Sequence, residues 1–309
     1  MISESPSESP ILDLQWIAVD WGTSNLRAWA IGARGEIAGF RMSASGMAKL
    51  HSREFERTLL ELVNSWLPNK EPVSVVACGM VGAKQGWLDA GYRKVPCEPI
   101  KRNSLIRAPT ESSRLVVSIV PGLSQDRPAD VIRGEETQIA GLLEKNISES
   151  SVVSMPGTHS KWVKLREANV QSFRTFMTGE LYSLIADHSV VRNAVASSEW
   201  REEVFLEAVE ECQKGQVALA AELFGLRARS LIADDSPATL RSRLSGLLVG
   251  HEIAEVRKSL GQEEIAIIGS DELTKPYRSA LEHLGYRTTI LDSEQVTVAG
   301  LKKVRELAD

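Results

Sequence analysis

The sequence predicts an α/β protein of two domains, each with a mixed β-sheet flanked by helices. The chain has 309 residues, which is more than one average domain. Strand hairpins are followed by alternating strand and helix segments, a pattern typical of mixed sheets with helices on their faces. A Gly-Thr pair also occurs in two similar strand–turn–strand settings, at Gly22-Thr23 and Gly157-Thr158. This repeat indicates two related halves.

The first half begins with an apolar run that ends at Asp20, and two further strands follow across short turns. A segment with apolar residues at helical spacing ends at Pro68, because proline cannot continue a helix. The predicted strands are residues 15–20, 25–32, 35–42, 73–78 and 115–120. The predicted helices are residues 52–67 and 132–145.

The second half also begins with two strands around a turn, P-G-T-H-S. Its predicted strands are residues 151–155, 161–165, 265–268 and 287–291. Its predicted helices are residues 179–187, 200–230, 236–260, 272–284 and 294–307. Within the helix over 236–260, Gly246 and Gly250 are four residues apart. We expect this pair of small residues to allow close packing across the domain interface.

We predict a disordered tail over residues 1–14, an N-terminal domain over 15–145 and a C-terminal domain over 146–309. The tail is polar and rich in Ser, Pro and Glu, and it lacks the basic and apolar regions of a signal peptide. The boundary is marked only by the string N-I-S-E-S-S. The last helix could cross back to the first domain.

The composition is that of an ordinary globular protein, with 43% hydrophobic residues, 25% charged residues and a net charge of -5. A mildly acidic chain is a poor candidate for nucleic-acid binding, which needs a basic surface. No apolar run approaches the ~20 residues of a membrane helix, so we expect no membrane partner. The three Cys form no C-x-x-C pair. We interpret them as reduced thiols in a cytoplasmic protein.

The turn after the first strand has the residues of a phosphate-binding hairpin. Gly22 lets the backbone approach an anion, and Thr23 and Ser24 add hydroxyl donors. Asp20 would be repelled by phosphates unless a cation lay between them, so we expect it to hold Mg²⁺ through water. The alternative is a plain hairpin with a capping aspartate.

Two later turns could add phosphate or nucleotide contacts. The second hairpin supplies Gly157, Thr158 and Lys161, although Lys161 could be a solvated strand lysine. Near residue 269 a strand runs into Gly269 and then into a helix capped by Ser270 or Asp271, which presents backbone N–H groups. The alternative for this third element is an ordinary capped strand–helix turn.

Two such hairpins and a late glycine turn resemble the sugar kinase/actin-like ATPase superfamily. Within it, several strings in this order resemble the 2-keto-3-deoxy-galactonokinase family: D-W-G-T-S-N-L-R-A-W, G-M-V-G, P-G-L, R-G-E-E-T-Q, M-P-G-T-H-S-K-W-V and F-R-T-F-M-T-G-E-L. The resemblance covers residues 15–309. It implies two actin-like (ribonuclease H-like) domains with an ATP cleft between them. It also implies transfer of phosphate from ATP, with Mg²⁺, to the 6-hydroxyl of 2-dehydro-3-deoxy-D-galactonate in galactonate breakdown.

The resemblance places the catalytic carboxylate in R-G-E-E-T-Q, where two glutamates stand in place of the usual aspartate. Glu135 and Glu136 point about 100° apart on a helix, so only one can face a cleft directly. We favour Glu136, because Ile139 and Ala140 mark its inward face. The other interpretation is that one or both glutamates stabilise the helix N-terminus. Asp126 and Asp130 are reserve candidates.

A sugar-acid substrate needs a cation for its carboxylate, and a bidentate arginine suits that planar group. Arg133 is our first candidate, with Arg27 and Arg174 next, although Arg27 could form a structural ion pair. Lys84 and Gln85 follow the glycine-rich string G-M-V-G and are further substrate candidates.

The leading hypothesis is therefore a sugar-acid kinase that acts on a small molecule. One alternative keeps the fold and changes the acceptor to another keto-deoxy sugar acid. A second alternative is a non-catalytic, ATP-dependent switch protein of the same fold. The sequence leaves open whether the protein is a monomer or a homodimer.

Overall fold

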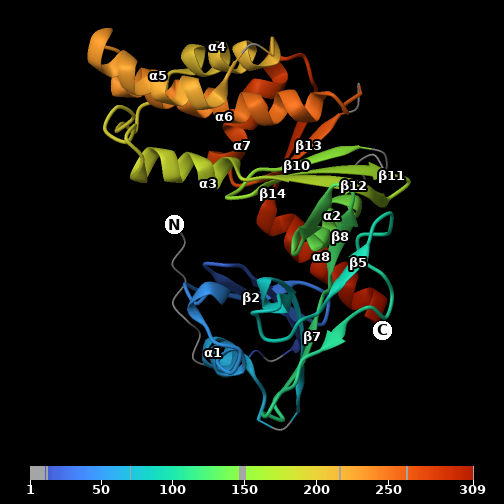
Figure 1. The fold of residues 1–309 in the computed structure, drawn as a ribbon. Coiled ribbons are helices and arrows are strands. Elements are labelled where there is room, and N and C mark those ends of the chain that lie inside the picture. The colour runs from blue at the N-terminus through green and yellow to red at the C-terminus, as the bar shows by residue number, and fades with distance from the viewer. Residues whose placement is uncertain are drawn as a thin grey trace. The chain divides into compact units, whose positions relative to one another are not determined.

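The structure is a computed structural model that describes residues 11, 13–69, 71–145, 151–215, 217–261 and 264–308. Most of the predicted tail, and the residues directly after the predicted boundary at 145, lie outside these ranges. The chain divides into two units (Figure 1). Unit 1 comprises Met1–Glu149, Ala168–Gln171 and Ser293–Asp309, and unit 2 comprises Ser150–Glu167 and Ser172–Asp292.

The described part of unit 1 contains a six-stranded sheet and a small three-stranded sheet. The larger sheet has the order β3-β2-β1-β4-β7-β6 and the smaller has the order β5-β8-β9. β1 is antiparallel to β2 and parallel to β4. The bounds are β1 (Leu14–Trp21), β2 (Leu26–Gly32), β3 (Ile37–Ser43), β4 (Val73–Gly79), β5 (Tyr92–Lys94), β6 (Ile106–Arg107), β7 (Leu115–Ile119), β8 (Gly122–Asp126) and β9 (Ala129–Ile132).

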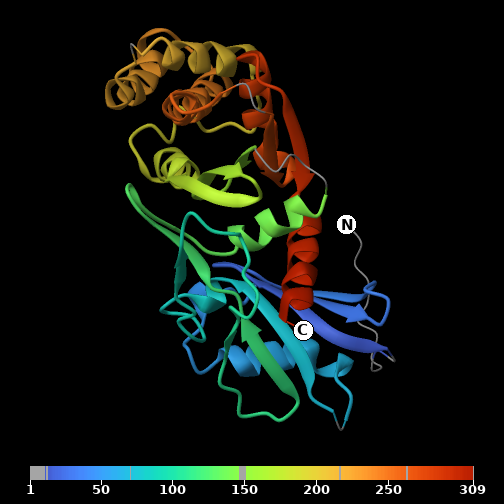
Figure 2. The same cartoon turned by 90° about the vertical axis from the view of Figure 1, so that its right-hand side faces the viewer.

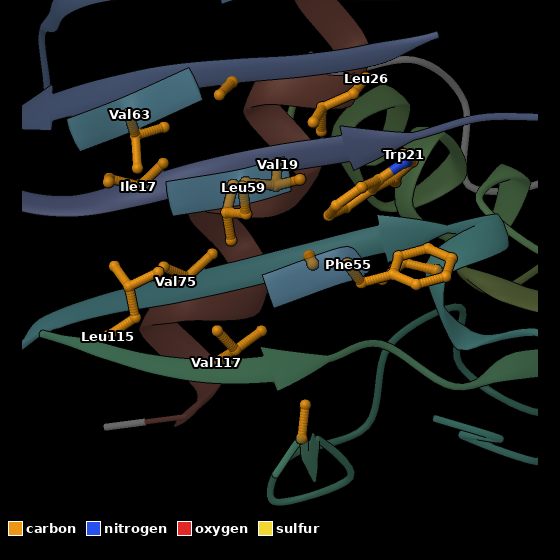
Figure 3. Packing of buried hydrophobic residues seen from close by; sticks show 14 of the residues in the cluster. Ile17, Val19, Trp21, Leu26, Phe55, Leu59, Val63, Val75, Leu115 and Val117 are labelled. Atoms are coloured by element: carbon orange, nitrogen blue, oxygen red, sulfur yellow. The ribbon is translucent and has the colours of Figure 1, made fainter. Parts of the chain in front are cut away.

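Helices cover both faces of the larger sheet, so its central strands are buried on both sides. On one face, Phe55, Leu59 and Val63 of α1 (Phe55–Val63) pack in one cluster with Ile17 and Val19 of β1 (Figure 3). Alternate residues of β1 point to the other face, as the period of a strand requires. There they join side chains from two further helices, α2 (Glu135–Leu143) and α8 (Ser293–Ala308).

The described sheet of unit 2 repeats the central part of this topology, with the order β12-β11-β10-β13-β14. β10 is antiparallel to β11 and parallel to β13, as β1 is to β2 and β4. The strands are β10 (Val152–Met155), β11 (Ser160–Arg166), β12 (Asn169–Phe176), β13 (Ile265–Gly269) and β14 (Thr288–Asp292). The α-helices are α3 (Thr178–Ser183), α4 (Glu202–Gln213), α5 (Leu219–Ile232), α6 (Pro237–Arg257) and α7 (Asp271–His283), and a π-helical turn over Leu184–His188 continues α3.

The predicted fold class is confirmed, because both units contain mixed sheets with flanking helices (Figure 2). The single helix predicted over 200–230 is wrong. The chain ends α4 and turns at Gly215, which has a φ of 70°, before α5 begins. None of the helices in the described ranges is long and apolar enough to cross a membrane.

The glycines of α6 pack against α4 within unit 2, and not across a domain interface as predicted. A Cβ atom at Gly246 would lie 2.4 Å from the backbone oxygen of Phe205, and one at Gly250 would lie 2.9 Å from Cα of Val209. The two glycines therefore let the backbones of α4 and α6 approach closely.

Candidate active site

The carboxyl ends of two parallel strands meet beside a small cavity in unit 1. β1 and β4 are in register, with Trp21 opposite Gly79. Asp20 and Gly79 line a cavity of about 130 Å³, together with residues near the starts of α2 and α8. Gly79 has a φ of 88°, and a Cβ atom there would lie 2.7 Å from the backbone oxygen of Trp21. Ligands of open α/β sheets bind at such strand ends, so this cavity is the candidate site of unit 1.

Asp20 is held in place by Arg27, which lies directly opposite it in the β1–β2 ladder. Both Nε and Nη2 of Arg27 donate to Asp20 Oδ2, with an Nε–Oδ2 distance of 3.2 Å. Burial opposes the charge of Arg27, but the carboxylate of Asp20 raises the pKa of Arg27 overall. Arg27, a predicted substrate contact, thus forms the ion pair that the sequence left as its alternative role.

The turn after β1 is closed by its own backbone. The N–H of Gly22 donates to the carbonyl oxygen of Asn25 over 2.9 Å. The carbonyl oxygens of Thr23 and Ser24 accept hydrogen bonds from residues of the loop at 46–48. The side chains of Thr23 and Ser24 are exposed. Because the N–H of Gly22 is already hydrogen-bonded inside the turn, an anion at this turn would be bound mainly by Thr23 and Ser24.

Arg133 brings an incompletely paired guanidinium to the cavity wall. Its side chain is 9% exposed, and its Cζ lies 4.3 Å from the ring centroid of Tyr92. Nη2 donates to the carbonyl oxygen of Gly91 over 3.0 Å. Nε and Nη1 are buried and find no hydrogen-bond partner among the residues that the structure describes. Buried polar groups are normally paired, so the fold leaves two donors of this guanidinium unused.

The two adjacent glutamates have different surroundings. Glu135 lines the cavity, and its Oε2 accepts the N–H of Arg133 over 2.8 Å. Glu136 is fully buried, and it accepts hydrogen bonds from the N–H of Gly134 over 2.7 Å and from Thr137 Oγ1 over 3.1 Å. Burial, and secondarily the charge of Glu135, raises the pKa of Glu136 to about 7. The inward helix face that favoured Glu136 in the sequence faces the protein core, whereas Glu135 faces the cavity.

A second, larger cavity of about 990 Å³ lies in unit 2. The β10–β11 turn contributes Gly157 and Thr158 to its wall, and α3, α6, α7, the loop Ser198–Trp200 and the start of α4 also line it. A Cβ atom at Gly179 would lie 2.3 Å from the carbonyl oxygen of Gly157, so α3 begins in direct backbone contact with the turn. The N–H of Glu180 donates to the carbonyl oxygen of Thr158 over 2.9 Å. The start of α3 therefore fixes the second Gly-Thr turn.

The other predicted nucleotide contacts lie close to this cavity but outside its wall. Lys161 is opposite Met155 in the β10–β11 ladder and is half-buried. Gly269 ends β13, and a Cβ atom there would lie 2.9 Å from Thr274 Cγ2. Ser270 takes the N-cap position of α7, and its carbonyl oxygen accepts the N–H of Thr274.

The residues of both cavities fall within one family signature. Residues 20–304 match the model of the family described as 2-keto-3-deoxy-galactonokinase. The chain belongs to the 2-keto-3-deoxy-galactonokinase family.

Full-length relatives agree with this membership. A Rhizobium meliloti (strain 1021) protein named "Probable 2-dehydro-3-deoxygalactonokinase" is 37% identical over 292 residues, which is 93% of this chain and 95% of the relative. The 2-dehydro-3-deoxygalactonokinase of Escherichia coli (strain K12) is 33% identical over 94% of this chain and 97% of its own. A crystal structure from Sinorhizobium meliloti, of a protein described by the same kinase name, has a TM-score of 0.85 at 35% identity. It covers 94% of this chain and 98% of the other.

The cavity of unit 1 fits the Mg²⁺ that a 2-keto-3-deoxy-galactonokinase would use with ATP. The described residues hold no group of three or more His, Cys, Asp or Glu able to bind a metal. Mg²⁺ bound with phosphates needs only one or two protein carboxylates, because waters and phosphate oxygens complete its shell. Asp20 lines this cavity and supplies one such carboxylate.

Three predicted substrate contacts of the family lie elsewhere. Arg174 is exposed on β12, and its Nη1 forms an ion pair with Glu255 over 2.8 Å. Lys84 and Gln85 are exposed in the loop after Gly82. Of the reserve bases, Asp126 pairs with Lys94, and Asp130 Oδ1 accepts the N–H of Val131. The structure thus brings Arg133, Glu135 and Asp20 together and leaves these others outside the described cavities.

Sequence reasoning missed several residues of the two walls. Thr297 and Gln138 line the cavity of unit 1, and Tyr92 stacks on Arg133. Thr178 and Gly179 line the cavity of unit 2. Both belong to F-R-T-F-M-T-G-E-L, one of the strings that resemble the family, so that string already held a signal for a functional segment.

We expect Glu136→Gln to change the pH dependence of stability. The pKa of Glu136 is raised from 4.5 to about 7 in the folded protein, so its stabilising contribution is complete below pH 4.5 and is lost as the pH rises toward 7. Glutamine stays neutral at every pH. We therefore expect the free energy of unfolding of the variant to exceed that of the parent by up to about 3 kcal/mol at pH 8, and by little at pH 5. Urea unfolding at both values measures this.

The control for this prediction is the exposed Glu203→Gln, which we expect to show no such difference between the two pH values. An equal change in the free energy of unfolding at pH 5 and pH 8 for Glu136→Gln would contradict the assignment of a buried, proton-retaining carboxyl.

Proposed function

We propose that the protein is an ATP-dependent kinase that phosphorylates the 6-hydroxyl of 2-dehydro-3-deoxy-D-galactonate. The products are 2-dehydro-3-deoxy-6-phosphogalactonate and ADP, and the reaction is a step of galactonate breakdown. Family membership and the names of the relatives support this proposal. The observation that carries it is the cavity lined by Arg133, Asp20 and Glu135, which places a cation and two carboxylates at one site. This set suits an acceptor that has both a carboxylate and a hydroxyl group.

In the proposed reaction, the 6-hydroxyl oxygen forms a bond to the γ-phosphorus of ATP. The bond from that phosphorus to the bridging oxygen breaks, and ADP leaves with the electron pair. The hydroxyl proton passes to a carboxylate, and we assign this role to Glu135 because it lines the cavity. Asp20 would hold Mg²⁺, which neutralises charge on the phosphates when bound.

We assign the phosphates and the nucleoside of ATP to the cavity of unit 2 and to the turn of unit 1. Gly157 and Thr158 present a turn backbone at the wall of a cavity of about 990 Å³, which is in the range of nucleotide-sized pockets. Thr23 and Ser24 add exposed hydroxyls at the other turn. Lys161, Gly269 and Ser270 remain proposed outer contacts of the nucleotide.

Arg133→Lys is expected to weaken binding of the sugar acid. Lysine lacks the planar fork that pairs with a carboxylate, and it cannot stack in the same way on Tyr92. We expect the KM for the acceptor to rise about tenfold while kcat changes less than about threefold. Initial rates at saturating Mg-ATP measure both constants.

The matched control is Arg41→Lys, because Arg41 also lies over an aromatic ring, Trp66, but donates to Leu62 and Ser65 outside the cavity. We expect an unchanged KM for this variant. An unchanged KM in Arg133→Lys would remove Arg133 from the substrate site.

The proposed function is tested by ADP release with Mg-ATP against 2-dehydro-3-deoxy-galactonate, its gluconate epimer, galactonate and no acceptor. Strong turnover with the first compound alone supports the proposal in full. Equal turnover with both epimers keeps the kinase and broadens its acceptor. ADP release that is independent of every acceptor rejects the kinase and favours an ATP-dependent switch protein. We expect the enzyme to act in the cytoplasm, without nucleic-acid or membrane partners.

A further inference from the structure

A carboxylate in unit 2 is buried beneath the wall of the large cavity. Glu252, on α6, is 2% exposed. Its Oε2 accepts hydrogen bonds from Ser160 Oγ over 2.7 Å and from the hydroxyl of Tyr277 over 2.8 Å. Its Oε1 accepts the indole N–H of Trp162 over 2.7 Å. The Thr178 side chain is a fourth hydrogen-bond partner.

These four partners come from three segments that form the cavity. Ser160 and Trp162 begin β11, directly after the Gly157-Thr158 turn. Thr178 begins α3, and Tyr277 lies on α7, and both line the cavity. Glu252 is not one of the lining residues. The turn, the start of α3 and the wall of α7 are therefore all fastened to one side chain that sits behind the wall.

The cost of this arrangement indicates a role beyond stability. Burial raises the pKa of Glu252, which means that the surroundings disfavour its charged form. Replacing a buried charged group by a well-packed apolar side chain is often neutral or stabilising, so packing alone does not explain a carboxylate here. A fully satisfied polar network, in contrast, holds its members in one arrangement. A carboxylate has two oxygens that can accept all four bonds at once.

We propose that Glu252 is a positioning residue for the nucleotide: it fixes the Gly157-Thr158 turn, the start of α3 and α7 in the geometry that binds ATP. This inference rests on the proposed function, which assigns the nucleotide to this cavity. Glu252 acts through Ser160, Trp162, Thr178 and Tyr277 and does not itself touch the ligand. Loss of the carboxylate should therefore weaken nucleotide binding and leave sugar-acid binding unchanged.

The test is the Kd of a non-hydrolysable ATP analogue, measured by calorimetry, together with the KM of the sugar acid. Glu252→Leu leaves the donors without an acceptor, so we expect the analogue to bind at least about tenfold more weakly. Glu252→Gln retains an acceptor for Trp162 and should recover most of the affinity. The KM of the sugar acid at saturating ATP should change less than about twofold in both variants.

Two further variants keep the test decisive. Leu226→Ala removes a fully buried side chain of α5 in the same unit, a helix that contributes no residue to the cavity wall. It should lower the Tm without changing the affinity for the analogue. If Glu252→Leu does not fold, Ser160→Ala can replace it. This variant removes a single donor and should raise the Kd of the analogue about threefold.

Thr158→Val separates this inference from the proposed function. If Thr158→Val raises the Kd of the analogue and Glu252→Leu only lowers the Tm, Glu252 has a merely structural role and the inference is overturned. If neither variant changes the Kd, the cavity of unit 2 does not hold the nucleotide, and the nucleotide assignment falls together with the inference. Weaker binding in both variants, with an unchanged sugar-acid KM, supports it.

Discussion

Asp20→Asn is expected to lower kcat by about 100- to 1,000-fold, the size of effect seen when one electrostatic contact to a transition state is removed. Asp20 ends β1 at the wall of the cavity that also contains Glu135. Asparagine keeps the shape of the side chain but removes the charge that would hold Mg²⁺ beside the phosphates. Asparagine keeps an oxygen that can accept a hydrogen bond from Arg27, so we expect only a modest fall in Tm. Steady-state rates over a range of Mg²⁺ concentrations, with a Tm for each variant, measure both effects.

Arg27→Gln is the matched control for this prediction. It breaks the same ion pair but leaves the carboxylate of Asp20 in place. We expect a fall in kcat of less than about tenfold, because the carboxylate loses only the partner that orients it. Equal losses in both variants would mean that the ion pair, and not a metal-binding charge, is what the reaction needs. Near-normal turnover in Asp20→Asn would reject the metal assignment.

Gly300→Ala is expected to lower the free energy of unfolding by about 3 kcal/mol, the upper range for overpacking a core. A Cβ atom at Gly300 of α8 would lie 1.9 Å from the backbone oxygen of Thr137 on α2. A backbone atom cannot rotate away, so the two helices must separate. Because Glu135 and Thr297 line the cavity from these helices, we also expect a lower kcat/KM. Urea unfolding and initial rates measure the two effects.

The control is Gly225→Ala on α5, where a Cβ atom meets nothing within 4 Å among the described residues. Alanine in an open helical position should stabilise the protein by about 0.5–1 kcal/mol. The two substitutions are chemically identical and differ only in their surroundings. A Gly300→Ala variant as stable as the parent would show that α2 and α8 tolerate a wider separation than their contact implies.

Local chemistry made the two hairpin turns predictable from the sequence. Each needs a Gly-Thr pair between short strands, and such a signal lies within a few neighbouring residues. In contrast, β5, β8 and β9 are short and lack a clear alternation of apolar and polar residues, so the sequence reads as loop where the small sheet forms.

The candidate site was predicted less completely, because its geometry depends on contacts between distant segments. Arg133 was predicted from its string, but its contacts with Gly91 and Tyr92 depend on the folded sheet. The helical pattern correctly marked Glu136 as inward-facing. It could not tell a face that meets the protein core from a face that meets a cavity, and the structure places Glu135 at the cavity instead.

The path of the chain has a consequence for synthesis. β14 ends unit 2 at Asp292, and α8 then begins at Ser293 and belongs to unit 1. The helix that completes the core of unit 1 is therefore translated only after all of unit 2. Until α8 has been made and docked, one face of the unit 1 sheet lacks Val298 and Leu301. We therefore expect an apolar surface of unit 1 to stay open to chaperones, or to aggregation, until the last helix docks.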